Sequence, residues 1–478
     1  MANYRKDRRE STLFVSGSLE QLLSANSVAR VIREGLERLD FAAFDAHYRN
    51  DVAGRSAINP RYLAAVLVLG LLRGVTSSLR LAQLCREDIE FRWLIGDVGV
   101  EKTTLCDFRK THKPELVSLS TQLLAALGEH GLLPGEHLGV DGTIVRAAAS
   151  RRSVKSRRRL ERHNKHLEAA IAERLAHDDC DSSSKQAHAL EKRRRRVQQA
   201  LEAMTARGLE EESARLTVTE PDATLKRQKD GTFAPGYNAQ VVTDLSSGAV
   251  IRTELVDSSG DGGQLQPQLE GAQEALDDSG ASGHETRSVT ADAAYHDTRQ
   301  LVELEGRGLR CYVPEDRNAK RQVPGVSPQF LAEAFVYDEH NDTMACPQGQ
   351  RLSRRKLNNT KTAIVYQARG RVCQNCPFKP QCCPKSKSGR SVNRPLYRET
   401  LDTVAKRMET PAGQSMRRAR QVVCEGAFAR LNILLHWGRC RMWNWRGAEM
   451  ELLWRQLTHN LMLLTGLWKP LVPQARIA

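Results

Sequence analysis

Two aspartates occupy similar positions in segments that have the pattern of β-strands. Asp141 is in the apolar segment 137–145 and is followed by Gly142, and Asp292 ends the segment 288–292. We expect each aspartate to close its strand, so that two carboxylates emerge together if the strands are neighbours. Such carboxylates are the hard oxygen ligands that Mg²⁺ or Mn²⁺ prefers, and two ions can clamp both oxygens of a phosphodiester displacement. A single aspartate at a strand end is usually a turn residue, so this prediction depends on the pair.

A cluster of cysteines is the second group that could bind a metal. Five of the eleven cysteines lie between residues 346 and 383. The spacing of Cys346, Cys373, Cys376 and Cys382 suits a tetrahedral, structural Zn²⁺ site, with Cys383 as the alternative fourth ligand. We also expect this segment to have few apolar residues around which to fold, which favours a metal. The alternative is a set of reduced thiols without a metal.

Basic residues outnumber acidic ones, 72 to 57, which gives a formal net charge of +15. This balance favours a polyanionic partner, usually nucleic acid, over a basic surface without a ligand. Two dense basic runs, 151–159 and 191–196, lie in helix-favouring sequence, and each basic side chain that neutralises a phosphate there would release counterions. We therefore expect DNA contacts from Arg151, Arg152, Arg157, Arg158 and Arg159, with a solvated charged face as the alternative.

The elements that must position these residues change character along the chain. Residues 19–130 have apolar residues at helical spacing and are expected to be all helix, with a helix-turn-helix DNA reader as one possibility. Strands are then expected at 137–145, 237–243, 249–256, 288–292 and 309–313, and helices at 264–276 and 298–304. The resulting order is β-β-β-α-β-α-β, followed by helices at 412–436 and 448–467.

These elements predict an α/β fold with several parts. Residues 1–130 form a helical N-terminal domain expected to bind DNA, and 131–146, 231–314 and 401–478 form the catalytic domain around a mixed sheet. Residues 147–230 are a basic insertion shaped as a helical hairpin, and 315–400 are a cysteine-rich insertion. The N-terminus has no apolar run typical of a signal peptide, and the longest apolar run, 62–72, is shorter than the roughly 20 residues that a membrane span needs. We expect a cytoplasmic protein.

Several short motifs follow one another in a recognisable order. They are Val-Asp-Gly-Thr at 140–143, Asp-Ala-Thr-Leu-Lys at 222–226, Gly-Tyr-Asn-Ala-Gln at 236–240 and Ala-Asp-Ala-Ala-Tyr at 291–295. This order resembles that of bacterial insertion-sequence transposases with a ribonuclease-H-like catalytic domain and an Asp-Asp-Glu triad. Ala294 stands where that family usually has Gly. The helical part, with the segments 58–60 and 104–109, is similar to the domain that precedes the catalytic fold in one branch of the family.

The resemblance implies a third acid on a late helix. The family pattern is Arg, a few residues, Glu, Phe three residues on, and Lys seven residues after the Glu. Segment 417–428 fits with Glu425 and Phe428, whereas Asn432 stands where Lys is usual. The implied triad is Asp141, Asp292 and Glu425, and the competitors for the third place are Glu409, Glu449 and Glu451. The basic residues expected to meet DNA here are Arg417, Arg418, Arg420 and Arg430; a salt-bridged helix face is the alternative.

The family resemblance implies a DNA transposase. The expected reaction is hydrolysis at the transposon ends and transfer of the freed 3′-hydroxyl to target DNA, with two Mg²⁺ or Mn²⁺ ions at the triad. The expected partners are double-stranded DNA, from the transposon ends and the target, and further copies of the chain in a homodimer or larger assembly. One alternative is a catalytically inactive, zinc-containing DNA-binding protein, either a decayed transposase or a regulator. The other is a nuclease of the same fold that only hydrolyses.

Overall fold

The structure, a computed structural model, describes residues 17–48, 56–176, 181–228, 230–258, 260–281, 285–315, 325–359, 361–436 and 438–471. The prediction made for the extreme N-terminus falls on residues 1–16, which lie outside the described part. Among the helices described, none is both long and apolar enough to cross a membrane.

The N-terminal part is helical, as the sequence predicts. Its described helices are α1 (Leu19–Leu22), α2 (Val28–Glu37), α3 (Ala42–Asp45), α4 (Pro60–Leu72), α5 (Ser78–Glu87), α6 (Ile89–Ile95), α7 (Lys102–Thr111) and α8 (Lys113–Glu129). Helix α4 is apolar on all sides and almost wholly buried, which is the pattern of a helix inside a bundle. Side-chain oxygens of Asn59, Ser77 and Asp88 accept hydrogen bonds from backbone N–H groups at the starts of α4, α5 and α6.

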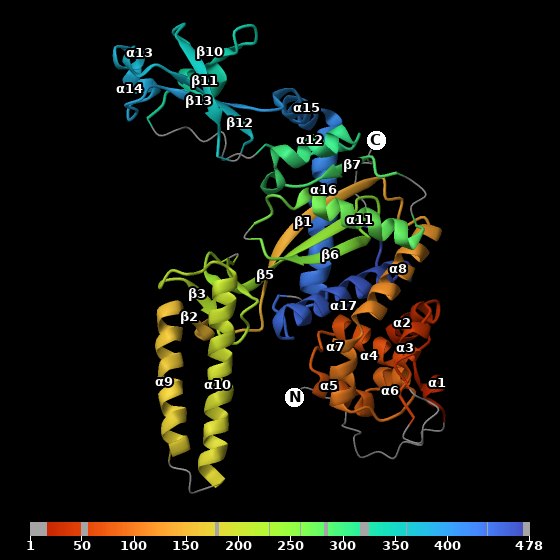
Figure 1. The fold of residues 1–478 in the computed structure, drawn as a ribbon. Coiled ribbons are helices and arrows are strands. Elements are labelled where there is room, and N and C mark those ends of the chain that lie inside the picture. The colour runs from red at the N-terminus through yellow and green to blue at the C-terminus, as the bar shows by residue number, and fades with distance from the viewer. Residues whose placement is uncertain are drawn as a thin grey trace, which may run out of the picture.

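A mixed sheet of six strands lies at the centre of the molecule (Figure 1). Its strands are β1 (His137–Arg146), β4 (Thr224–Arg227), β5 (Phe233–Asp244), β6 (Val250–Val256), β7 (Ser288–Thr290) and β8 (Arg310–Tyr312). The strand order is β4-β5-β1-β7-β8, and β6 also pairs with β5. Strand β5 is antiparallel to its three partners, whereas β1, β7 and β8 run parallel. Parallel pairing joins His137–Gly139 to Ser288–Thr290, so β7 ends beside the first half of β1.

Helices pack on the sheet and join it to the N-terminal part. They are α11 (Leu265–Ser279), α12 (Thr298–Gly306), α15 (Arg398–Glu409), α16 (Pro411–Ala429) with a π-helical turn at Arg430–Leu434, and α17 (Asn444–Leu464). Helix α17 is buried along most of its length and contacts both β6 and α8. Its Trp454 Nε1 donates to the carbonyl of Arg109 at 3.2 Å, and its Asn460 side chain pairs with the backbone of Val250. The last helix therefore links the sheet to the N-terminal helices.

A helical hairpin stands apart from the sheet, at the far end of β1 and β5 (Figure 1). It consists of α9 (Arg157–Ala176) and α10 (Asp181–Ala206), and the short antiparallel strands β2 (Val154–Ser156) and β3 (Arg215–Thr217) pair at its base. The two helices share a narrow apolar core of Leu160, Leu167, Val197, Ala200 and Met204. Since the core is narrow, most of the basic side chains face outward.

The cysteine-rich segment forms a small sheet of its own. The strands are β9 (Val336–Asp338), β10 (Thr343–Ala345), β11 (Arg351–Leu357), β12 (Ala363–Ala368) and β13 (Ser391–Pro395), with short helices α13 (Gly370–Gln374) and α14 (Lys379–Cys382). All neighbouring strands are antiparallel. Its core includes Phe335, Met344, Leu352 and Tyr366. The expectation that this segment lacks apolar residues to fold around is therefore wrong.

Candidate active site

The parallel pairing of β1 with β7 brings Asp141 and Asp292 together. Gly139 pairs with Thr290. Asp141 and Asp292 each lie two residues after this pair, one on either segment. Asp292 follows β7, and its carboxylate accepts a hydrogen bond from the Ala294 N–H at 2.8 Å. Asp141, in contrast, lies in the middle of β1. The expectation that it closes the strand is wrong, because pairing with β5 continues to Arg146.

The carboxylate of Asp141 is in an electrostatically unusual position. Its side chain is only 16% exposed and pairs with the Nη1 atom of Arg420, from α16, at 3.2 Å. Burial raises the pKa of Asp141 to about 6, with smaller upward contributions from the charges of Asp292 and Asp261, whereas Arg420 lowers it. A carboxyl with a raised pKa beside other carboxylates is typical of a site that binds a cation or transfers protons.

Asp261 is a third carboxylate at this site, and sequence reasoning missed it. It lies in the connection between β6 and α11, and a Cβ atom added to Gly142 would be 2.6 Å from its Oδ1. Its carboxylate accepts hydrogen bonds from the side chains of Gln240, at 2.8 Å, and Asn238, at 3.2 Å. The Tyr295 hydroxyl donates to the same Gln240 at 2.5 Å. The one signal in the sequence is an aspartate before two glycines at the start of a helix.

Glu425 lies on α16, the helix that covers this part of the sheet. Its neighbour Cys424 is buried against β1 and β5, where the thiol is 3.3 Å from the Thr243 hydroxyl. Burial raises the pKa of Cys424 to about 12, and the charges of Asp141 and Glu425 add to this. The Glu425 side chain itself is exposed. Of the α16 side chains, Arg420 is the one that the structure pairs with an aspartate of the site.

The alternative candidates for the third acid are Glu409, Glu449 and Glu451, and none of them is paired with a residue of the aspartate cluster in the described part of the chain. Glu451 is buried and accepts hydrogen bonds from the backbone of Arg441 and Met442, both at 2.5 Å. Glu449 pairs with Lys113 at 2.9 Å. Glu409 ends α15. Two of the three competitors thus have structural roles outside the aspartate cluster.

The basic residues of the late helices divide into two groups. Arg417 and Arg418 are exposed on α16. Arg420 is largely buried against Asp141, and Arg430 donates to the carbonyl of Lys469 at 2.5 Å and stacks on Trp468. Burial lowers the pKa of Arg430. Only the first group presents guanidinium groups to solvent.

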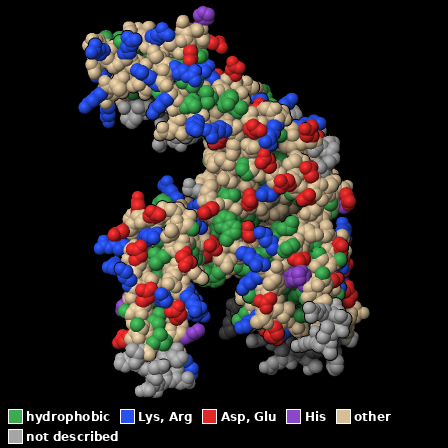
Figure 2. Space-filling model, viewed as in Figure 1, with side chains coloured by type: hydrophobic (Ala, Val, Ile, Leu, Met, Phe, Trp, Pro, Cys, Tyr) green, Lys and Arg blue, Asp and Glu red, His purple; other side chains and the backbone are tan. Residues whose placement is uncertain are grey.

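The basic residues at the root of the hairpin divide in the same way. Arg157 is held inside it by Glu161, at 3.0 Å, and by the carbonyl of Leu209, at 3.1 Å. Arg151, Arg152, Arg158 and Arg159 are exposed. Arg151 pairs with Asp230, and Arg158 pairs with Glu212. Lys and Arg side chains are spread over the hairpin among Asp and Glu side chains (Figure 2). A hollow at its base is lined by Lys155, Arg159, Arg162, Arg193 and Arg196.

The cysteines of the small sheet are gathered around one small cavity. It is lined by Cys346, Cys373, Cys376, Cys382 and Cys383. Two backbone N–H groups donate to sulfur, those of Gln350 to Cys346 at 3.3 Å and of Arg390 to Cys373 at 3.4 Å. No three of the described sulfur atoms lie within 4.8 Å of one another. The thiols therefore surround one cavity, and Cys383 lies within hydrogen-bond reach of Cys373 and Cys382, but no three of these described sulfur atoms are mutually as close as zinc ligands.

Two family models match parts of the chain. A family model described as a transposase DDE domain matches residues 345–465, and one described as a transposase domain (DUF772) matches residues 17–111. Neither match includes Asp141 or Asp292. A solved piggyBac transposase synaptic complex with hairpin DNA is 11% identical over 93% of this chain and 80% of that chain, with a TM-score of 0.23. No curated protein matches the chain.

Proposed function

We propose that this chain, a DNA transposase with a DDE domain, cleaves transposon ends and joins them to target DNA at the cluster of Asp141, Asp292 and Asp261. The transposase identity follows from the two family matches, which lie at the two ends of the chain. The observation that supports the site is the register of β1 and β7, which brings two aspartates together on adjacent parallel strands. The sheet, with its order β6-β5-β1-β7-β8, supports the ribonuclease-H-like fold expected from the sequence.

The donor set of the cluster fits Mg²⁺ or Mn²⁺. Its oxygens are carboxylates, which are the ligands these ions prefer, and Asp141 and Asp292 would hold them. Bound there, divalent ions supply charge stabilisation for phosphodiester displacement. Arg420 offsets the negative charge of Asp141. Gln240 and Asn238 orient Asp261 by hydrogen bonds, so the third carboxylate is held in one position.

Glu425 is our candidate for the third acid of the triad, by its place in the matched DDE segment and beside Cys424. Asp261 is the alternative, because it already lies at the aspartates. The two are distinguished by Glu425→Gln and Asp261→Asn in the same cleavage assay. Loss of cleavage in the first variant alone supports the triad with Glu425, and loss in the second alone assigns the third place to Asp261.

DNA binding by the hairpin and by α16 completes the proposal. The exposed Arg158, Arg159, Arg417 and Arg418 are available to phosphates, and each contact would release counterions. Arg157, Arg420 and Arg430 have internal partners, so we assign them positioning roles. We also propose that the chain acts in the cytoplasm as a dimer or larger assembly on paired ends, which sizing of the DNA complex by light scattering tests.

We propose a structural Zn²⁺ at the cysteine cavity. Its support is the gathering of five thiols around one cavity and the two N–H···S hydrogen bonds, which orient sulfur ligands. Because the small sheet has a core of its own, we expect the ion to stabilise this part rather than to be required for its folding. Loss of one bound zinc per chain in Cys373→Ser, with the sheet still folded, is the expected result.

The test of the function is metal-dependent cleavage and joining. The substrate is linear DNA carrying the sequences that flank the coding region of this chain, and a supercoiled plasmid is the target. We expect nicking and joining with Mg²⁺, and loss of both in Asp141→Ala and Asp292→Ala. Asp278→Ala, on the exposed side of α11, is the control and should keep both activities.

Three outcomes would separate the alternatives. Nicking without joining identifies a nuclease, and DNA binding without nicking identifies an inactive DNA-binding protein. Unchanged nicking in both aspartate variants would show that the site is elsewhere.

A further inference from the structure

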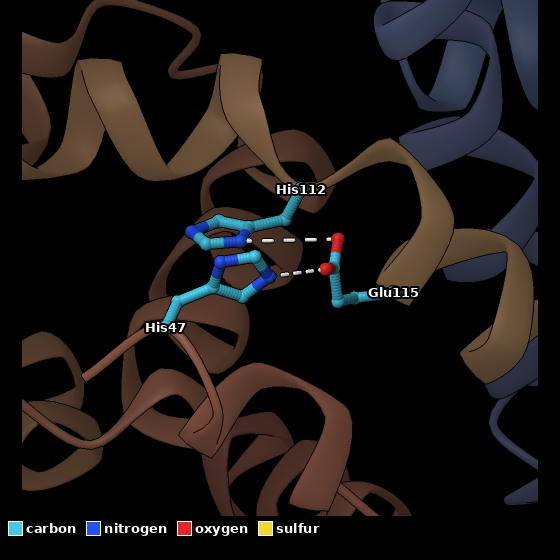
Figure 3. A group of neighbouring side chains, drawn as sticks. All are labelled: His47, His112 and Glu115. Atoms are coloured by element: carbon cyan, nitrogen blue, oxygen red, sulfur yellow. Dashed lines mark hydrogen bonds and ion pairs between the residues drawn. The ribbon is translucent and has the colours of Figure 1, made fainter. Parts of the chain in front are cut away.

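Three side chains of the N-terminal part form a cluster outside the aspartate site (Figure 3). His47 follows α3, His112 stands between α7 and α8, and Glu115 is in the first turn of α8. Nε2 of His47 contacts Oε1 of Glu115, and Nδ1 of His112 lies 3.9 Å from Oε2 of the same carboxylate. One nitrogen or oxygen atom of each residue lies within 4.8 Å of those of the other two.

The carboxylate of this cluster is buried and only partly satisfied. Glu115 is 9% exposed, and within the described part of the chain its Oε2 atom has no hydrogen-bond partner. This oxygen points toward the His112 ring (Figure 3). Leaving a buried carboxylate oxygen without a hydrogen-bond partner destabilises the folded state. A ligand between the three side chains would remove this cost.

The histidine rings are held in place by aromatic packing. His112 lies 5.2 Å from the Phe44 ring, 5.1 Å from the Phe108 ring and 5.0 Å from the His47 ring, between centroids. The side chain of His47, by contrast, is 51% exposed. The His112 ring is therefore held in one position, whereas the His47 ring has room to move.

We propose that His47, His112 and Glu115 bind one zinc ion. Two imidazoles and one carboxylate are a ligand set that suits Zn²⁺, and its bonds of about 2.0–2.1 Å place neighbouring ligand atoms roughly 3.3 Å apart. In the structure the three ligand atoms lie within 4.8 Å of one another, so the site must contract when the ion binds. The fourth position then faces solvent on the side of His47 and takes a water molecule.

The ion would connect segments that lie far apart in the sequence. It joins the residues after α3 to the junction of α7 and α8. Phe108, at this junction, packs on Trp454 of α17 with ring centroids 6.1 Å apart. Zinc would thus stabilise the N-terminal helices at the place where they meet the last helix.

The test is zinc binding by the full chain, measured after removal of metal and titration with Zn²⁺ against a chromophoric chelator. His47→Gln is the main variant, because its half-exposed side chain makes loss of folding least expected. We expect it to weaken one zinc site at least about tenfold, since even outer partners of metal ligands have effects of that size. The cysteine thiols are unchanged in this variant, so any zinc they bind cancels in the comparison. His130→Gln, exposed near the end of α8, is the matched control and should bind as the parent does.

A second variant and a second metal make the result decisive. Glu115→Gln keeps the shape of the side chain and should weaken the same site. The spectrum of the Co²⁺-loaded His47→Gln variant is subtracted from that of the Co²⁺-loaded parent. The difference should show ligand-field bands without thiolate charge-transfer bands, because nitrogen and oxygen atoms are the ligands. If both folded variants bind as much zinc as the parent with the same affinity, the cluster is a hydrogen-bonded ion pair only and the proposal is overturned.

Discussion

Replacing Asp141 by Asn should change the stability of the metal-free protein in a pH-dependent way. The folded-state pKa of Asp141 is about 6, against an ordinary value of 3.8, because the side chain is buried. Between these pH values the folded protein holds a proton that the unfolded chain has lost. The ionised carboxylate therefore destabilises the fold above pH 6, and this cost disappears as the pH falls through 6 toward 4.

The magnitude follows from the difference in pKa. About two pH units at 1.36 kcal/mol each correspond to roughly 3 kcal/mol. Asp141→Asn has no titrating group at this position. The free energy of unfolding of Asp141→Asn, relative to that of the parent, should thus be larger by roughly 2.4 kcal/mol at pH 7.5 than at pH 4, where about 0.6 kcal/mol of the cost remains. Constant effects of the substitution cancel in this double difference.

The assay is urea unfolding in EDTA at the two pH values, followed by tryptophan fluorescence. Asp278→Asn, an exposed carboxylate on α11, is the control and should show little pH dependence relative to the parent. Added Mg²⁺ at pH 7.5 should stabilise the parent more than Asp141→Asn. A double difference below about 1 kcal/mol, or one of opposite sign, would refute the account of Asp141 as a buried, destabilising carboxylate.

Three further substitutions test other parts of the structure. Gly139→Ala should destabilise the fold by about 1–3 kcal/mol in urea unfolding and reduce nicking, because its Cβ would overlap the Cys424 sulfur and displace α16. Tyr237→Phe should cost about 1–3 kcal/mol in the same assay, because the buried Glu220 loses a hydroxyl donor at 2.7 Å; an unchanged midpoint would contradict this. Arg159→Ala should lower the slope of log affinity for DNA against log salt by about 1, and an unchanged slope would remove this residue from the interface.

The order of the main elements could be predicted because helical and strand periodicity are local properties. The position of Asp141 within its strand could not, because the length of β1 is set by its pairing with β5, which continues to Arg146. Strands of three or four residues, such as Thr224–Arg227, are too short to show a period, and they form only by adding to an existing edge.

The composition of the site was predictable only in part. The aspartates follow from strand order, whereas Asp261 lies in an irregular loop and reaches the site through the folding of the β6–α11 connection. Arg420 has the pattern of a DNA contact in the sequence, but the structure pairs it with Asp141. His47 and Glu115 are distant in the chain, and only the tertiary fold brings the residues after α3 to the start of α8.

The continuation of β1 past Asp141 has a consequence for the proposed cleavage of DNA. Arg146 is the fifth residue after Asp141. At a rise of about 3.4 Å per residue, this part of β1 extends roughly 17 Å toward the root of the hairpin. Over this length β1 stays paired with β5, so the hairpin is attached by a two-stranded ribbon rather than a single flexible linker. DNA held by the hairpin would then lie at a set distance from the carboxylates. The length of the ribbon would thus fix the distance between the bound DNA and the carboxylates. Lengthening both of its strands by two residues should therefore move the cleavage position along the DNA.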